Sequence, residues 1–384
     1  MRTASAQLRE SLERFLQIEA ASGLLLVAAT LAALVWANTL ASSYEAVWNA
    51  PLRIAPDTTL RSCLNEGLMT VFFLLIGLEI RGELRDGALS SIRQLTVPVA
   101  AALGGVLVPS LVYLAVTHGE RLQRGWAIPT ATDVAFAVGV LSLLGSRVPS
   151  NVRVLLLALA IVDDIAAILI IALFYSDGTD LWGLAILAAA VAALFACQRL
   201  RVASLWAYVL AGVVAWFGLL RAGVHPTLAG VILGLALPAH EGGGLSARLQ
   251  RALHPWVAFA ILPAFALANT GIRFDGLNWS AGGSQRLTAG IVLALLIGKP
   301  LGIAAFAWLT VKTRLGTLAP SVTWRGVALV GCLGGVGFTM SLLIATLAFS
   351  GSAALATAKF AVLAGSSLAG ATGLLVGSAL LKRP

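Results

Sequence analysis

The chain has 384 residues, of which 59% are hydrophobic and only 11% are charged. With a mean hydropathy of +0.92, this composition excludes an ordinary soluble domain and predicts an all-α membrane protein that crosses the bilayer many times. The formal net charge of +9 raises the question of a nucleic-acid partner, so the distribution of the basic residues matters.

A window of about 19 residues finds twelve apolar spans. If both termini face the cytoplasm, 17 of the 26 Lys and Arg residues fall in inside segments and 7 in outside loops, while Lys299 and Lys359 lie within spans. This excess on one side is the positive-inside pattern, so the basic charge gives no support to a nucleic-acid role. The predicted spans lie at 17–37, 65–84, 95–117, 126–144, 153–175, 181–198, 203–219, 222–238, 255–271, 288–311, 326–349 and 354–381.

Two loops are long enough to hold structure of their own. Residues 38–64 follow the first span, and their Pro56-Asp57 turn is compatible with either a short hairpin or an irregular loop. Residues 239–254 begin with a glycine run and continue as SARLQRAL, which predicts a flexible joint and a short amphipathic surface helix. The three cysteines are widely spaced and indicate neither a disulfide framework nor a zinc site, and we expect no cofactor.

Two predicted spans contain residues that interrupt helices. In 125–139, Pro129 removes a backbone donor close to Thr132 and Asp133, and in 331–341 four glycines stand within seven residues. Close helix packing also explains a glycine-rich stretch. Broken helices in corresponding places nevertheless favour a transport site.

The two interruptions fall in the middle of two groups of three spans, spans three to five and spans ten to twelve. The groups are offset by seven spans. Because seven is an odd number, the two groups cross the membrane in opposite directions, which predicts an inverted repeat. We expect its core bundle to cover about 95–175 and 288–381, and the remaining helices to form an interface bundle within the same transporter domain.

Four ionisable residues lie deep within predicted spans: Asp133, Asp163, Asp164 and Lys299. An isolated charge in the bilayer centre costs several kcal/mol. A structural ion pair would explain them, but buried pairs seldom add stability, which favours a functional role. Neighbouring helix residues point about 100° apart, so Asp163 and Asp164 cannot both aim at one point in a regular helix.

These residues predict a division of labour. One aspartate binds a cation or a proton, while the other faces both that site and the ammonium of Lys299, because carboxylates accept both kinds of ligand. The hydroxyl of Thr132 and carbonyl oxygens of the unwound segment complete the shell. Asp133 is placed to offset the positive N-termini of half-helices and Lys299 their negative C-termini.

Seven sequence motifs occur in chain order, namely FFLLIGLEIRGEL (72–84), PTATDVAFAVGVLSLLG (129–145), LALAIVDDIAAILIIALFY (157–175), GVHPTLAGVILG (223–234), LHPWVAFAILPAFALANTG (253–271), LLIGKPLGI (295–303) and GCLGGVGFTMS (331–341). Together they resemble the NhaA-type sodium/proton antiporters of bacteria. The resemblance implies twelve helices with two crossed, broken ones, an inner-membrane location and exchange of intracellular Na+ or Li+ for external protons, hence sodium export, pH homeostasis and no enzyme activity. It places the cation- and proton-binding acids on Asp163 and Asp164, the threonine and the dipole-compensating acid on Thr132 and Asp133, and the intramembrane lysine on Lys299.

The chain departs from the family at positions that bear on regulation. Relatives carry an acid-histidine pair ahead of HPW, whereas this chain has Gln250 and Arg251 and retains only His254. A second basic position in GLEIRGEL is Gly82. The pH response of the family therefore does not carry over, and the transport site does.

Other candidates for a pH response are Glu79, Glu83 and His225. His225 equally fits a residue that ends one helix and starts the next. The family dimerises through a hairpin after the first helix, so the resemblance implies a homodimer in the lipid bilayer that uses residues 38–64. This loop is short for such a hairpin.

Three rival functions are weaker. A cation-coupled carrier of organic anions needs anion-binding groups, whereas the charges here are mainly acidic. An intramembrane aspartyl protease needs two acids face to face, which adjacent residues on one helix provide poorly. A passive cation channel would show rings of repeated acids, which this sequence lacks.

Overall fold

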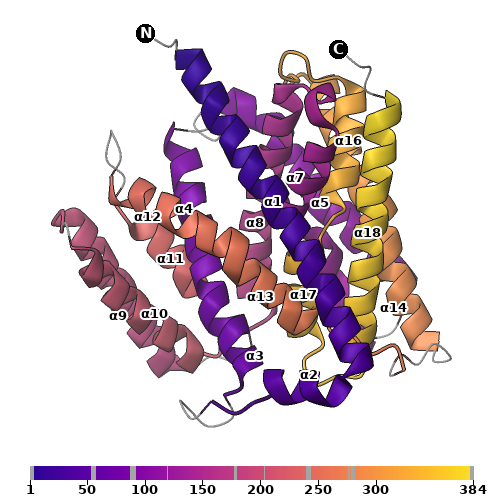
Figure 1. The fold of residues 1–384 in the computed structure, drawn as a ribbon. Helices are drawn as coiled ribbons and strands as arrows, with labels where there is room; N and C mark the ends of the chain where they lie inside the picture. Colours follow the sequence, from indigo (N-terminus) through magenta and orange to yellow (C-terminus); the bar gives the residue numbers. More distant parts are fainter. Residues whose placement is uncertain are drawn as a thin grey trace. The chain divides into compact units, whose positions relative to one another are not determined.

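The structure, a computed structural model, describes residues 4–52, 58–86, 92–118, 120–176, 180–202, 204–238, 244–275, 277 and 282–380. Its regular structure in these ranges is helical (Figure 1), as the composition predicted. One isolated antiparallel β-bridge joins Pro51 to Thr59. The chain divides into two compact units, the first formed by Met1–Ala41, Ile92–Asp163 and Asn269–Pro384 and the second by Ser42–Ser91 and Asp164–Ala268.

The described residues include nine helices that are long and apolar enough to cross a membrane, or ten if the bent pair α16 and α17 counts as one span. Large apolar side chains are exposed on several of these helices, for example Leu111, Leu173 and Phe195 at 64%, 74% and 65%. Exposed apolar surface of this kind suits contact with lipid rather than with water. The protein is therefore a multi-pass membrane protein.

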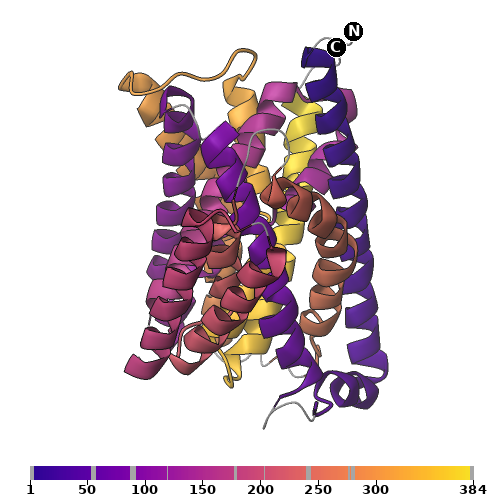
Figure 2. The ribbon, with the colours of Figure 1, turned by 90° about the vertical axis from the view of Figure 1, so that its left-hand side faces the viewer.

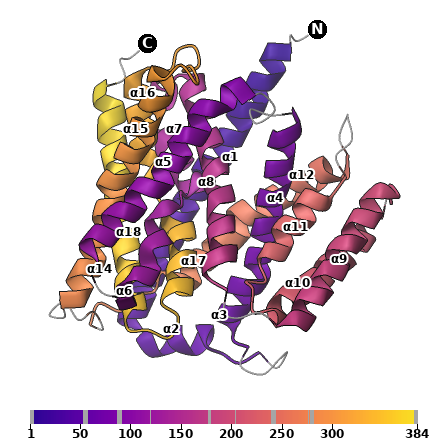
Figure 3. The same ribbon diagram turned by 180° about the vertical axis from the view of Figure 1, so that it is seen from behind.

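The first unit contains the two interrupted spans. Within it, α5 and α15 lie side by side (Figure 3). Gly104 and Gly302 make this approach possible, because a Cβ atom on either glycine would lie only 2.1 to 2.2 Å from the backbone oxygen of the other. The elements of this unit are α1 (Ala4–Thr39), α5 (Ile92–Val116), α6 (Glu120–Gln123), η3 (Arg124–Thr130), α7 (Val134–Leu143), η4 (Gly145–Arg147), α8 (Ser150–Phe174, as far as Asp163), α14 (Gly282–Leu293), η6 (Ala294–Gly298), α15 (Lys299–Lys312), α16 (Trp324–Gly334), α17 (Phe338–Ala348) and α18 (Ala354–Leu380).

The second unit holds the remaining helices. Figure 2 shows α9 and α10 side by side, and α4 packs on α11 where Gly77 and Gly230 bring the two backbones together. Its elements are α2 (Ala41–Trp48, from Ser42), α3 (Leu60–Ser62), η1 (Cys63–Leu68), α4 (Met69–Asp86), the remainder of α8, α9 (Leu181–Arg199), α10 (Leu205–Arg221), α11 (Leu228–Ala236), α12 (Leu245–Trp256), η5 (Val257–Ile261) and α13 (Leu262–Asn269).

Two predicted features differ in detail from the structure. The predicted span 222–238 contains only the nine-residue α11, because Gly223, with φ of 72°, and Pro226 form a turn ahead of it. The predicted surface helix after the glycine run is not separate, since one continuous 25-residue helix runs through Leu245–Asn269. Most of the glycine run, like the predicted Pro56-Asp57 turn, lies outside the described residues.

The ends of the loop after α2 are paired. The Leu52 N–H donates to the Thr58 carbonyl at 2.7 Å and the Leu60 N–H to the Ala50 carbonyl at 3.1 Å. These bonds flank the bridge between Pro51 and Thr59. Of the two alternatives for this loop, the ends therefore fit a short hairpin.

Candidate functional site: two helix breaks and a buried ion pair

The first break separates η3 from α7. Pro129 lies in the last turn of the 3-10 helix η3, which ends at Thr130, and Ala131 and Asp133 have extended backbone angles before α7 begins at Val134. Extended residues leave backbone groups without helical partners, and such groups must be satisfied inside a membrane protein. The Asp133 N–H does so by donating to the Val336 carbonyl at 2.7 Å.

The second break separates α16 from α17, whose axes differ by 43°. It contacts the first break, because the Val336 carbonyl accepts the Asp133 N–H, and the Ser341 hydroxyl donates to the Ile128 carbonyl at 2.6 Å. Gly335 lets the second break approach η6 closely, since a Cβ atom there would lie 2.3 Å from the Leu295 carbonyl oxygen. The sequence-predicted pair of broken helices is thus present and the two contact each other.

Asp133 joins the N-termini of both half-helices. Its Oδ1 accepts the Phe136 N–H at 2.9 Å in α7, and its Oδ2 accepts both the N–H and the hydroxyl of Thr339 in α17, at 3.0 and 2.5 Å. The carboxylate is 3% exposed. A negative charge at two helix N-termini is stabilised by the partial positive charge of each.

Asp163 lies at the centre of a second cluster, with Lys299 and Thr132. Its Oδ2 is 2.9 Å from Lys299 Nζ and accepts the Thr132 hydroxyl at 2.5 Å. Both side chains of the ion pair are fully buried. Lys299 Nζ also donates to the Thr130 carbonyl at the end of η3, so the ammonium meets the negative end of that short helix.

One oxygen of Asp163 is left over. Its Oδ1 is buried and makes no hydrogen bond. Buried polar atoms nearly always have partners, so an orphaned acceptor marks a place where a proton or a cation can bind. Asp163 is therefore held by one oxygen and open at the other.

Asp164 follows Asp163 in α8 and is 5% exposed. The helical offset of about 100° turns its side chain away from that of its neighbour. Among the described residues, no group of three or more His, Cys, Asp or Glu side chains could hold a metal ion. The oxygen atoms around Asp163 come from carboxylate, hydroxyl and backbone carbonyl groups, which are ligands that suit hard cations.

Sequence reasoning missed some partners of the predicted residues. Thr339 donates two hydrogen bonds to Asp133, the Thr130 carbonyl accepts one from Lys299, and the Gly334 carbonyl accepts one from Thr132. The available signal was the position of Thr339, a hydroxyl directly after the glycine-rich break. No local pattern links it to Asp133, which lies 206 residues earlier.

The candidates for a pH response belong to the second unit, whereas Asp163, Lys299 and Thr132 belong to the first. Glu79 and Glu83 belong to α4, and His254 to α12. His225 lies in the turn before α11, where its Nδ1 is 2.7 Å from the Thr227 hydroxyl. Burial lowers the pKa of His225 to about 4, so its imidazole is neutral at neutral pH.

The substituted pair Gln250 and Arg251 lies in α12, near the start of its continuous helix. The Arg251 Nε donates to the Ala247 carbonyl one turn earlier, at 3.2 Å, and the side chain is exposed. A fixed positive charge therefore occupies a position ahead of His254.

Comparisons with known proteins agree with the geometry. A family model described as "Na+/H+ antiporter 1" matches residues 13–376. A protein named Na(+)/H(+) antiporter NhaA from Bordetella petrii is 47% identical over 97% of this chain and 91% of its own length. Proteins of the same name from Cupriavidus necator and an Acidovorax species are 46% and 48% identical, over 96% and 97% of this chain and 89% and 92% of their own lengths.

Proposed function

The chain belongs to the Na+/H+ antiporter 1 family, and from this premise we propose that it exchanges intracellular Na+ or Li+ for external protons across a bacterial inner membrane. It is a secondary transporter and needs no cofactor, because the ions are its substrates. Both termini face the cytoplasm, in keeping with the positive-inside distribution. Its role is sodium export and pH homeostasis.

The observation that carries the proposal is the unpartnered Oδ1 of Asp163, next to an oxygen shared by Lys299 and Thr132. Facing the cytoplasm, deprotonated Asp163 and Asp164 bind Na+. The loaded core moves relative to the rest of the protein, and outside, protons displace the cation from the same carboxylates. Because protons and Na+ compete, turnover rises with pH even without a dedicated sensor.

If two protons exchange for one Na+, each cycle moves one net positive charge inward and the membrane potential drives export. Either both protons bind the aspartates, or one binds Lys299 after Na+ breaks its pairing with Asp163. We favour the second, since a buried lysine loses its proton readily once its counter-ion is taken. A Lys299→Gln protein with full electrogenic exchange would eliminate that version and leave the first.

We propose that the protein has the twelve membrane-spanning helices of the family, in which spans three to five and spans ten to twelve form an inverted repeat. Residues 95–175 and 288–381 form the core bundle, and the other helices form the interface of a homodimer that uses residues 38–64. The two breaks that contact each other within one compact unit support this arrangement. Where the two breaks meet, the negative charge of Asp133 offsets the partial positive charge of the helix N-termini, and the positive charge of Lys299 offsets the partial negative charge of a helix C-terminus.

The test is Na+-driven proton movement in sealed proteoliposomes that contain a pH-sensitive dye, scanned from pH 6 to 9. The native chain should exchange, and Asp164→Asn should not. The shape of the native profile shows how Gln250, Arg251 and Gly82 affect regulation. If the native chain moves no protons in response to Na+ at any pH, the assignment fails, and uptake of organic anions would be the next activity to measure.

A further inference from the structure

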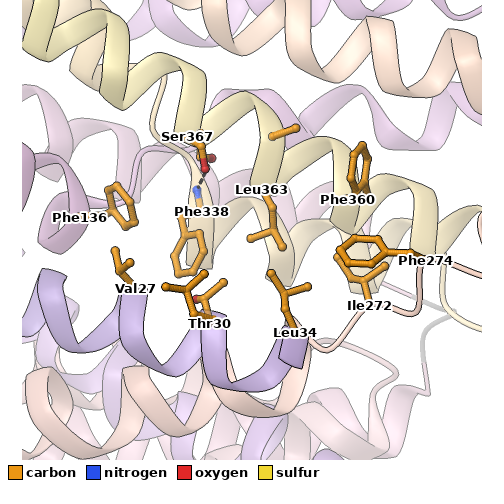
Figure 4. Close-up of a pocket in the computed structure, with 13 residues that line it drawn as sticks. Val27, Thr30, Leu34, Phe136, Ile272, Phe274, Phe338, Phe360, Leu363 and Ser367 are labelled. Atoms are coloured by element: carbon orange, nitrogen blue, oxygen red, sulfur yellow. Dashed lines mark hydrogen bonds between the residues drawn. The ribbon is translucent and has the colours of Figure 1, made fainter. Parts of the chain in front are cut away.

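A cavity of about 230 Å³ lies within the first unit, beside the contact between the broken helices. Figure 4 shows side chains from α1, α7, α17 and α18 converging on it, together with Ile272 and Phe274 from the segment after α13. It is lined by Val27, Thr30, Leu31, Leu34, Phe136, Ile272, Phe274, Phe338, Phe360, Leu363, Ala364, Ser366 and Ser367. Neither the ion pair nor Asp133 lines it.

The wall of the cavity is apolar in character. Its buried polar side chains are already engaged, because the Thr30 hydroxyl donates to the Leu26 carbonyl at 2.8 Å and Ser366 Oγ accepts the Phe338 N–H at 3.1 Å. An enclosed water needs two to four polar partners, and apolar cavities instead bind apolar molecules. The apolar wall therefore suits the binding of a hydrocarbon.

The cavity follows two membrane-spanning helices. Val27 to Leu34 on α1 and Phe360 to Ser367 on α18 each cover eight residues, a rise of roughly 10 Å from the first residue to the last. The rim is open, since Leu31 is 57% exposed and Phe274 50%. The wall at that end is held by Asn38, which donates to the Ile272 carbonyl at 2.8 Å and accepts the Phe274 N–H at 3.0 Å.

The volume of the cavity limits which apolar groups can enter it. A helix segment of the same length is a cylinder about 10 Å across, with a volume on the order of 800 Å³, so a neighbouring helix could insert only its side chains. Pockets for drug-sized ligands also start near 300 Å³. A single hydrocarbon chain is narrow enough to enter, and the bilayer supplies such chains along the whole length of α1 and α18.

We propose that this cavity binds one acyl chain of a membrane lipid. The bound chain contacts the rings of Phe136 and Phe338, whose centroids are 5.3 Å apart. These residues belong to the first turns of α7 and α17, and the Phe136 N–H donates to Asp133. The lipid chain thus packs directly against the contact between the broken helices, and the site exists whichever ion the protein transports.

The test uses a phosphatidylethanolamine that carries a diazirine in the middle of one acyl chain, at a small mole fraction in phosphatidylethanolamine/phosphatidylglycerol bilayers. After illumination, labelled peptides of the full-length native protein are mapped by mass spectrometry. Peptides that contain residues 27–34 and 360–367 should be labelled with a saturable dependence on probe. Excess unlabelled phosphatidylethanolamine should compete, whereas the exposed surface of α10 should be labelled in proportion to probe.

Ala364→Phe fills the cavity and should remove the saturable labelling. Ala371→Phe is the matched control, because it adds the same ring to an exposed position of α18 outside the cavity and should leave the labelling intact. Both variants are checked by thermal unfolding. If Ala364→Phe fails to fold, the competition measured on the native chain still decides.

Three outcomes would overturn the proposal. Labelling of the cavity peptides that rises only in proportion to probe, as on α10, would mean bulk lipid contact. Labelling that persists unchanged in a folded Ala364→Phe protein would show that the cavity is not the labelled site. Cross-links between two copies of the chain at α1, without labelling by lipid, would show that a second protein molecule covers the cavity.

Discussion

Asp133 and Asp163 are both buried carboxylates in the same unit, at 3% and 1% exposure, yet their surroundings differ. The two oxygens of Asp133 accept three hydrogen bonds from two helix N-termini. Asp163 uses one oxygen for Lys299 and Thr132 and leaves the other without a partner. A satisfied carboxylate holds the two breaks together, and an incompletely satisfied one is available to exchange ligands.

The largest expected effect comes from breaking the buried ion pair. Asp163→Asn or Lys299→Gln alone leaves a buried charge uncompensated, so each should lower the free energy of unfolding by about 3–5 kcal/mol. The double variant should lose less than either single one, because no charge remains. Thermal and chemical unfolding in detergent at neutral pH would measure this.

If the double variant instead loses as much stability as the two single variants together, Asp163 and Lys299 are not coupled, and this would contradict the role given to Asp163. Asp133→Asn paired with the same Lys299→Gln serves as the control. Asp133 accepts hydrogen bonds from Phe136 and Thr339, whereas Lys299 pairs with Asp163, so we expect these two losses to be closer to additive than those of the ion pair.

A smaller effect distinguishes the two threonines that donate to these carboxylates. Valine has the shape of threonine without its hydroxyl. Thr132→Val removes a donor to Asp163, and the KM for Na+ should rise by about tenfold, or 1.4 kcal/mol of binding. Thr339→Val removes one donor from Asp133 and should lower stability by about 1–3 kcal/mol with KM unchanged.

Exchange assays over a range of Na+ concentrations, together with unfolding curves of both variants, would separate the two roles. Equal changes of KM in Thr132→Val and Thr339→Val would contradict the division between a holding and a binding carboxylate.

The smallest effect concerns His225, a buried titratable group outside both clusters. Its pKa of about 4 keeps the imidazole neutral between pH 6 and 9, so His225→Gln should leave the pH profile of exchange unchanged. In the unfolded chain a histidine titrates near 6.5. The stability linked to the neutral imidazole is therefore fully present above that pH and is lost as the pH falls towards 4.

Unfolding temperatures at pH 7 and pH 5 check this sign. The native protein should lose more stability over this interval than His225→Gln does. A shift of the exchange profile by about one pH unit in the variant would instead make His225 part of the pH response.

Much of this picture was predictable because intramembrane charges are rare and costly. Asp163, Lys299 and Asp133 stood out in the sequence by that criterion alone, and Pro129 and the glycines of 331–337 located both breaks. The ion pair between Asp163 and Lys299 was among the predicted arrangements, and the structure contains it at 2.9 Å.

The partners of these residues were not predictable in the same way. Thr339 contacts Asp133, and Gly334 contacts Thr132, because the two breaks pack against each other. This packing joins segments about 200 residues apart in the chain, and a single sequence carries no local signal for it. The orphaned Oδ1 of Asp163 likewise follows from the directions of side chains, which periodicity does not specify.

The most direct test of the central claim is equilibrium binding of radioactive Na+ to purified protein at alkaline pH, comparing the native chain with Asp163→Asn and Asp133→Asn. If the open oxygen of Asp163 binds the cation, the native protein and folded Asp133→Asn bind Na+ and Asp163→Asn does not. Binding of Na+ to Asp163→Asn with native affinity would contradict the account.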